Sequence, residues 1–170
     1  LDVLIKSSVD PLLALEYHRH FTHSLFFIPF GALLVALALQ PLLGRRWLLS
    51  FKQTYLWALL GYATHALLDA CTSYGTQLLW PLSSQRFAWD TISVVDPLFT
   101  LPLLALVLVA ALKRRPQAAL AGVLWVNIYL GVGYLQHERA LAMGRALAEA
   151  RGHTVTRLEV KPSFANLAVW

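Results

Sequence analysis

Residues 24–46 read SLFFIPFGALLVALALQPLLGRR, and this stretch decides the fold class. Residues 24–43 carry no charged side chain. An α-helix rises about 1.5 Å per residue, so about 20 apolar residues cross the roughly 30 Å hydrocarbon core of a bilayer. Arg45 and Arg46 then end the apolar run. The stretch therefore predicts a membrane-spanning helix followed by a basic turn.

Three further apolar stretches follow, at about residues 54–70, 92–112 and 117–135, and none carries Lys or Arg in its middle. The chain as a whole is 58% hydrophobic and only 14% charged. An ordinary soluble domain is about 45–50% apolar and about 25% charged. We therefore predict an all-α integral membrane protein built as a four-transmembrane-helix bundle, with a fifth such helix in the full-length chain.

Basic residues gather in two of the predicted turns. Arg45, Arg46 and Lys52 lie between the first and second helices, and residues 113–115, Lys-Arg-Arg, lie between the third and fourth. The positive-inside rule places such turns in the cytoplasm, which leaves the opposite helix ends extracytoplasmic. The net charge of +5 is thus explained by membrane topology, and we expect no nucleic-acid partner.

The remaining segments are more polar. Residues 72–91 contain Gly75, Pro81, Ser83 and Ser84, which is typical of an irregular loop. Residues 137–151 suit an amphipathic helix and residues 154–160 alternate like a strand. We therefore divide the chain into a transmembrane domain, 1–135, and an extracytoplasmic tail, 136–170, which we expect to be the start of a small extramembrane domain.

Histidine and aspartate gather at two places that the topology brings to one side of the membrane. His18, His20 and His23 directly precede the first predicted helix, and His65 and Asp69 form an i, i+4 pair near the end of the second. Residues at that spacing share one face of a helix. Because the first helix begins where the second ends, both groups reach the same membrane depth.

Imidazole and carboxylate are ligands for zinc, manganese and iron. Ionisable side chains near hydrocarbon are costly and usually functional, although a single histidine at a helix end is more often a hydrogen-bonded residue. For the combination of His18, His23, His65 and Asp69 we predict metal binding. His20 is left open between a ligand and another role.

Three further charged residues have candidate roles. Asp90 precedes a predicted helix and is expected to cap its start. Asp96 lies deeper in the apolar run, so capping and a role at the metal site, as a ligand or as a support that holds a histidine N–H, fit its position equally. Arg19 could stabilise an anionic oxygen or anchor the chain at the lipid headgroups.

Four motifs occur together in a fixed order. They are His18-Arg19-x-x-Thr22-His23-Ser24, His65-x-x-x-Asp69, Thr72-Ser73-Tyr74-Gly75-Thr76, and Asp90 followed by Asp96. With them the chain resembles the bacterial membrane-bound metal-dependent hydrolases of the YbcI and YdjM type. The resemblance implies a multi-pass protein of the bacterial inner membrane. It also implies an earlier membrane segment ending in Pro-Asp-x-Asp, whose second Asp would be Asp2 and would join the metal ligands.

The H-x-x-x-D motif also resembles part of the zinc-dependent phospholipase C site, which implies a phosphoester or lipid-like substrate. We therefore expect a hydrolase that uses one or two divalent metals, zinc first and manganese or iron next, on a small-molecule or lipid substrate at the extracytoplasmic face. Arg19 and Asp96 would assist the chemistry. Two alternatives remain: a metal or proton transporter, and a non-catalytic membrane scaffold with a structural metal site.

Overall fold

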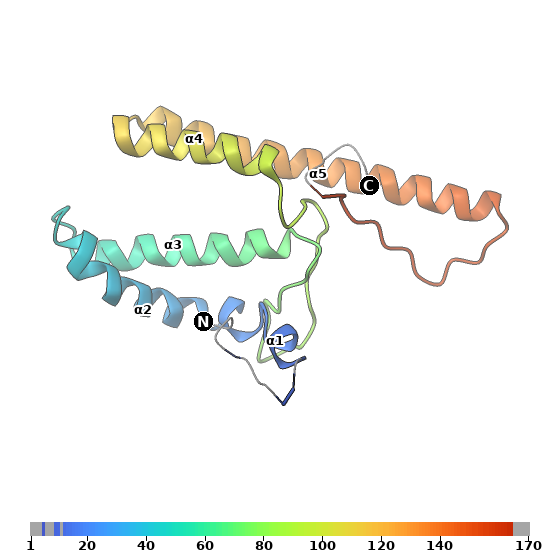
Figure 1. The fold of residues 1–170 in the computed structure, drawn as a ribbon, viewed down its shortest axis with the longest axis horizontal. Coiled ribbons are helices and arrows are strands. Elements are labelled where there is room, and N and C mark those ends of the chain that lie inside the picture. Colours follow the sequence, from blue (N-terminus) through green and yellow to red (C-terminus); the bar gives the residue numbers. More distant parts are fainter. Residues whose placement is uncertain (1–4, 6–8, 11, 165–170) are drawn as a thin grey trace. The chain divides into compact units, whose positions relative to one another are not determined.

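The structure is a computed structural model that describes residues 5, 9–10 and 12–164. In chain order these residues form α1 (Leu13–Glu16), the short 3-10 turn η2 (Phe21–His23), α2 (Ile28–Leu39), the π-helical turn η3 (Gln40–Gly44), α3 (Phe51–Ala70), α4 (Pro97–Lys113) and α5 (Pro116–Ala150) (Figure 1). The predicted all-α class is confirmed for this part of the chain. Asp2 lies outside the described residues.

The chain divides into two compact units. The first contains α1 to α3 as far as Ala70, together with the loop Tyr74–Ala88. The second contains Cys71–Ser73 and the chain from Trp89 onward, with α4 and α5. The domain boundary predicted after residue 135 falls inside α5.

In the first unit α2 and α3 pack as a hairpin through small residues. Ala32 and Ala36 on α2 and Ala66 on α3 are fully buried. Gly31 sits so close to α3 that a Cβ atom there would lie 2.7 Å from Cζ of Tyr62. Small residues allow helix backbones to approach closely, which is how helices associate in membranes.

The turn of this hairpin is closed by a half-buried amide, that of Gln40. Gln40 donates from Nε2 to the Leu49 carbonyl at 3.1 Å, and Thr54 Oγ1 donates to Gln40 Oε1 at 2.6 Å. Arg45 and Arg46 lie in this turn, at the opposite end of α3 from Asp69. The hairpin therefore has one basic end and one end that carries the histidines.

The loop Tyr74–Ala88 covers the histidine end. Its backbone joins the preceding segment through two bonds, Gln77 N–H to the Arg19 carbonyl at 3.1 Å and Leu25 N–H to the Leu78 carbonyl at 2.8 Å. Leu78 belongs to the buried core formed with α2 and α3. The loop predicted for residues 72–91 is confirmed as irregular and joined by isolated bridges only.

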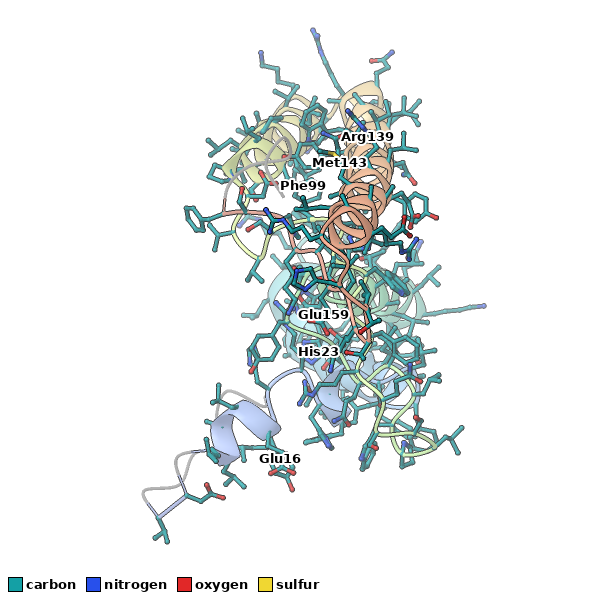
Figure 2. The ribbon with its side chains drawn as sticks, turned by 90° about the vertical axis from the view of Figure 1, so that its right-hand side faces the viewer. Glu16, His23, Phe99, Arg139, Met143 and Glu159 are labelled. Carbon is teal, nitrogen blue, oxygen red and sulfur yellow. The ribbon has the colours of Figure 1, made fainter. Side chains whose placement is uncertain are left out.

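The second unit is the hairpin of α4 and α5. Phe99, labelled in Figure 2, lies on α4. It packs against Tyr129 on α5 with ring centroids 5.4 Å apart, and Trp125 Nε1 donates to the Phe99 carbonyl at 3.1 Å. Gly122 lies beside the Leu103 side chain, so small residues again allow a close approach.

Two predictions for the tail are corrected by α5. The expected separate amphipathic helix at residues 137–151 continues the preceding apolar helix without a break, because no proline or capping residue interrupts the chain between them. After Gly152 the chain reverses, and Leu158 lies 3.2 Å from the position of a Gly144 Cβ (Figure 1). Residues 154–160 form no strand, since no second strand pairs with them.

Only part of the predicted four-span bundle meets a strict test of length and hydropathy. Among the described helices, α5 meets this test by itself. One bent pair, Leu13–His23 and Ile28–Gly44, meets it only when the two are counted as one span across an 85° bend. The α4 helix is apolar but has 17 residues. Lys52, His65 and Asp69 make α3 too polar. The four-span arrangement is therefore not confirmed.

Candidate metal centre

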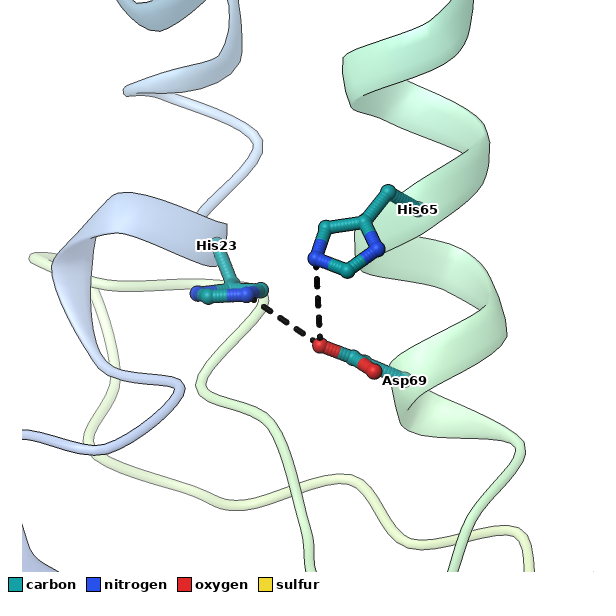
Figure 3. Close-up of side chains that lie close together, drawn as sticks. All are labelled: His23, His65 and Asp69. Atoms are coloured by element: carbon teal, nitrogen blue, oxygen red, sulfur yellow. Dashed lines mark ion pairs between the residues drawn. The ribbon is translucent and has the colours of Figure 1, made fainter. Parts of the chain in front are cut away.

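The end of α3 and the turn η2 bring together three of the predicted ligands (Figure 3). His23 Nε2 lies 3.1 Å and His65 Nε2 lies 3.7 Å from the same oxygen, Oδ2 of Asp69. One potential ligand atom from each of these residues lies within 4.8 Å of the other two. Two imidazoles and one carboxylate therefore converge on one point.

Local hydrogen bonds fix the position of His23. Ser24, fully buried, donates from Oγ to the Phe21 carbonyl at 2.8 Å and accepts from Phe27 N–H at 3.1 Å, which holds the turn between η2 and α2. Thr22 Oγ1 lies 3.0 Å from Nδ1 of His23 and is also buried. With Nδ1 engaged in this way, Nε2 is the nitrogen presented to Asp69.

Arg19 binds the other side of the same carboxylate. Its Nη2 lies 3.3 Å from Asp69 Oδ1, and Nη1 donates to the Asp69 backbone carbonyl at 3.2 Å. The guanidinium carbon also lies 5.3 Å from the centroid of the Tyr74 ring. Arg19 has a φ of 52°, a left-handed conformation that is uncommon for residues other than glycine. This strained position turns a buried cation toward Asp69 and leaves Oδ2 facing the imidazoles.

The cluster is buried on one side and open on the other. The side chains of His23 and Asp69 are 12% and 15% exposed, whereas that of His65 is 63% exposed. Catalytic zinc sites use three protein ligands and keep one position open, and two histidines with one carboxylate is a known set. The residues present therefore fit a divalent metal that is reached from the His65 side.

Two other histidines, His18, which was predicted to be a ligand, and His20, whose role was left open, do not point into this cluster. The His18 ring packs edge-on against Tyr74, with centroids 4.7 Å apart, and does not join the cluster. The His20 ring lies among aromatic rings, 5.1 Å from that of Tyr17 and 5.7 Å from that of Trp80. The structure thus favours a packing role for His20 and leaves His23, His65 and Asp69 as the residues that could hold a metal ion.

Asp96 in the second unit is engaged by neutral donors. Its Oδ1 accepts from Phe99 N–H at 3.1 Å and its Oδ2 accepts from Tyr129 Oη at 2.8 Å. It is 4% exposed and caps α4. Of the two interpretations, the structure shows the cap. Asp90, which we expected to cap a helix start, lies six residues before the actual cap Asp96 and has a φ of 50° in the connecting loop.

Sequence reasoning missed Arg86, which ties the loop of the first unit to the histidine segment. Its guanidinium donates to the carbonyls of Glu16 at 2.6 Å, His18 at 3.1 Å and Gly75 at 3.2 Å. Arg86 is the one Lys or Arg between residues 72 and 91. A lone cation in a neutral loop is the signal that could have identified it.

Comparison with known proteins gives a family. Neither the curated proteins nor the solved structures contain a match to this chain. The sequence profile of the YdjM inner membrane protein family matches residues 1–140. This range includes His23, His65 and Asp69 and the whole first hairpin, and it ends inside α5. Because the match covers most of the 170 residues, the chain belongs to the YdjM inner membrane protein family.

Proposed function

We propose that this protein is a metal-dependent hydrolase of the inner membrane that cleaves an ester or phosphoester at the extracytoplasmic face. The observation that carries the proposal is the convergence of His23 Nε2 and His65 Nε2 on Oδ2 of Asp69. These groups would hold one divalent ion, with zinc the best match to the donor set and manganese or iron next.

The surrounding residues suit hydrolysis of a negatively charged substrate. A divalent metal, when bound, supplies Lewis-acid activation of water and of a substrate oxygen. Thr22 fixes the ring of His23, and Arg19 holds the Asp69 carboxylate in place. Arg19 also keeps a permanent positive charge beside the cluster, which favours the negative charge of a phosphate or of a developing oxyanion.

The charge distribution supports an extracytoplasmic site. Arg45 and Arg46 lie in the turn between α2 and α3, and Lys52 lies in the first turn of α3. His65 and Asp69 lie at the other end of that helix. If the basic end faces the cytoplasm, as the positive-inside rule predicts, the metal cluster faces the opposite side of a multi-pass protein.

The groove between α2 and α3 favours hydrolysis over transport. An ion path needs polar groups that continue from the cluster along the hairpin. Between His65 and the basic end the groove is lined instead by apolar residues, among them Gly61, Ala58 and Leu39. An ion released at His65 would meet apolar side chains.

Metal analysis of the purified protein tests the proposal. We expect about one equivalent of zinc after purification without chelator, and loss of that zinc in His65→Ala, whose exposed side chain can be removed with little effect on packing. His153→Ala, an exposed histidine in the second unit, is the matched control and should keep its zinc. Folded wild-type protein that takes up neither zinc nor manganese would overturn the proposal.

Activity is the second part of the test. Metal-loaded protein is assayed on a panel of membrane phospholipids and water-soluble phosphoesters, beside His65→Ala. Hydrolysis by the wild-type protein that is absent in His65→Ala supports the proposal. Stoichiometric zinc without hydrolysis of any member, combined with a large drop in thermal stability of His65→Ala, would show that the metal is structural.

A further inference from the structure

A groove runs along the contact between α2 and α3 in the first unit. Its volume is about 660 Å³. Trp47 and Leu43 line it at the basic end of the hairpin, and His65 lines it at the other end. His65 is also a member of the metal cluster, so the groove and the candidate site are continuous.

The wall of the groove is apolar along the whole hairpin. Val35 and Leu39 contribute from α2, and Trp57 and Ala58 contribute from α3. Gly61 leaves the middle open, because a Cβ atom there would meet no atom within 4 Å. Two lining residues, Thr54 and Tyr62, carry a hydroxyl, and Thr54 Oγ1 donates its hydrogen bond to Gln40. The groove is therefore suited to hydrocarbon.

The length of the groove matches one leaflet of the membrane. Thr54 and His65 both line it and are eleven residues apart on α3, which corresponds to about 16 Å along the helix axis. Half of a hydrocarbon core of roughly 30 Å is about 15 Å. An acyl chain about as long as one leaflet is thick, starting at the level of the cluster, would thus lie along the groove from His65 to Thr54 near the basic end of the hairpin.

We propose that this groove binds one acyl chain of a phosphate-bearing membrane lipid and presents the lipid's phosphoester to His23, His65 and Asp69. The proposal rests on the hydrolase function proposed above and names its substrate class. Charge supports this occupant, because Arg19 is a buried cation against Asp69, in the cluster that includes the lining residue His65, and a phosphodiester is an anion. Hydrolysis adds the water oxygen to phosphorus, breaks the P–O bond to one alcohol, and transfers a proton to that alcohol.

Lipid photolabelling tests the groove without depending on catalysis. The full chain is reconstituted in vesicles of phosphatidylethanolamine and phosphatidylglycerol that contain a trace of phosphatidic acid with a diazirine in the middle of one acyl chain. We expect labelling to concentrate on Val35, Leu39 and Trp57 rather than on Phe30 and Leu34, which are exposed on α2 outside the groove.

Gly61→Leu closes the groove, since the new side chain enters open space without disturbing the packing of α3. Gly131→Leu on α5 is the matched control, because Gly131 is also helical, exposed and without a neighbour within 4 Å. We expect Gly61→Leu to reduce labelling of the groove about tenfold, and Gly131→Leu to leave it unchanged.

The outcomes separate the groove from the proposed function. If all exposed apolar residues are labelled equally, and the two glycine variants are labelled equally, the proposal that the groove binds an acyl chain is wrong, whether or not the protein is an active hydrolase. If Gly61→Leu lowers the labelling of the groove and the protein shows no hydrolase activity, the result supports lipid binding in the groove and counts against the proposed function alone. In active protein, Gly61→Leu should raise KM for a long-chain phospholipid and leave KM for a water-soluble phosphoester unchanged, and an equal effect on both would contradict the proposal.

Discussion

The two hairpins each carry a buried aspartate at the end away from their basic turn, and the two aspartates have different partners. Asp69 in the first hairpin faces two imidazoles and a guanidinium. Asp96 in the second accepts hydrogen bonds from a backbone N–H and a tyrosine hydroxyl. The Asp69 side chain is 15% exposed and the Asp96 residue as a whole is 4% exposed, so both are largely inaccessible. Burial alone therefore does not distinguish the two sites.

The partners distinguish them. A hydroxyl and an amide donate hydrogen bonds to Asp96 and satisfy both of its oxygens, so that carboxylate is fixed as part of the fold. Imidazole nitrogens can donate a hydrogen bond or bind a metal, so His23 and His65 can exchange their contact with Asp69 for a shared ion. The comparison predicts that metal binding belongs to the first hairpin only.

The largest effect is expected for Asp69→Asn. The substitution removes a ligand and leaves the buried Arg19 without its charged partner in this cluster, and breaking a buried ion pair costs about 3–5 kcal/mol. We expect zinc content to fall to background and the free energy of unfolding to fall by about that amount, measured by metal analysis and by denaturant unfolding in detergent.

Asp96→Asn is the matched control for this change. It alters an aspartate at the equivalent end of the second hairpin and should keep the zinc content of the wild type. Loss of zinc in Asp96→Asn together with full occupancy in Asp69→Asn would reverse the comparison.

Gly31→Ala tests the packing that positions the first site. The added Cβ would lie 2.7 Å from the Tyr62 ring, so that ring or α2 must shift. Such overpacking costs about 1–3 kcal/mol. We expect a lower melting temperature, whereas Gly61→Ala on α3, where nothing lies within 4 Å, should raise it slightly through helix propensity. Equal melting temperatures for the two variants would show that α2 and α3 are not in close contact.

Thr22→Val tests how strongly the position of the His23 ring affects zinc binding, with little change to the packing around it. The variant keeps the volume of a buried side chain and removes the hydroxyl that lies 3.0 Å from His23 Nδ1. Loss of such a partner weakens metal binding about 10-fold to 100-fold, and we expect the lower end, measured by competition with a zinc chelator. Thr54→Val makes the same change at the basic end of the hairpin, where the hydroxyl binds Gln40, and should not alter zinc affinity.

Much of the first site was predictable because it depends on local periodicity. The i, i+4 spacing of His65 and Asp69 fixes their shared face once α3 forms. The positions of His18 and Arg86 were not predictable in this way. The left-handed backbone at Arg19 separates the directions of His18 and His23, and the contacts of Arg86 join segments about 70 residues apart in the sequence. Neither feature leaves a periodic pattern in the sequence.

The smallest effect is expected for Tyr129→Phe in the second hairpin. The substitution keeps the aromatic packing with Phe99 and removes only the hydroxyl that donates to Asp96 Oδ2 at 2.8 Å. A single hydrogen bond between membrane helices contributes on the order of 1 kcal/mol. We expect a loss of that size in unfolding free energy with unchanged zinc content and unchanged zinc affinity. Zinc affinity should therefore fall in Thr22→Val, in the first hairpin, and stay unchanged in Tyr129→Phe, in the second. A fall in zinc affinity in Tyr129→Phe would mean that Asp96 supports the metal cluster.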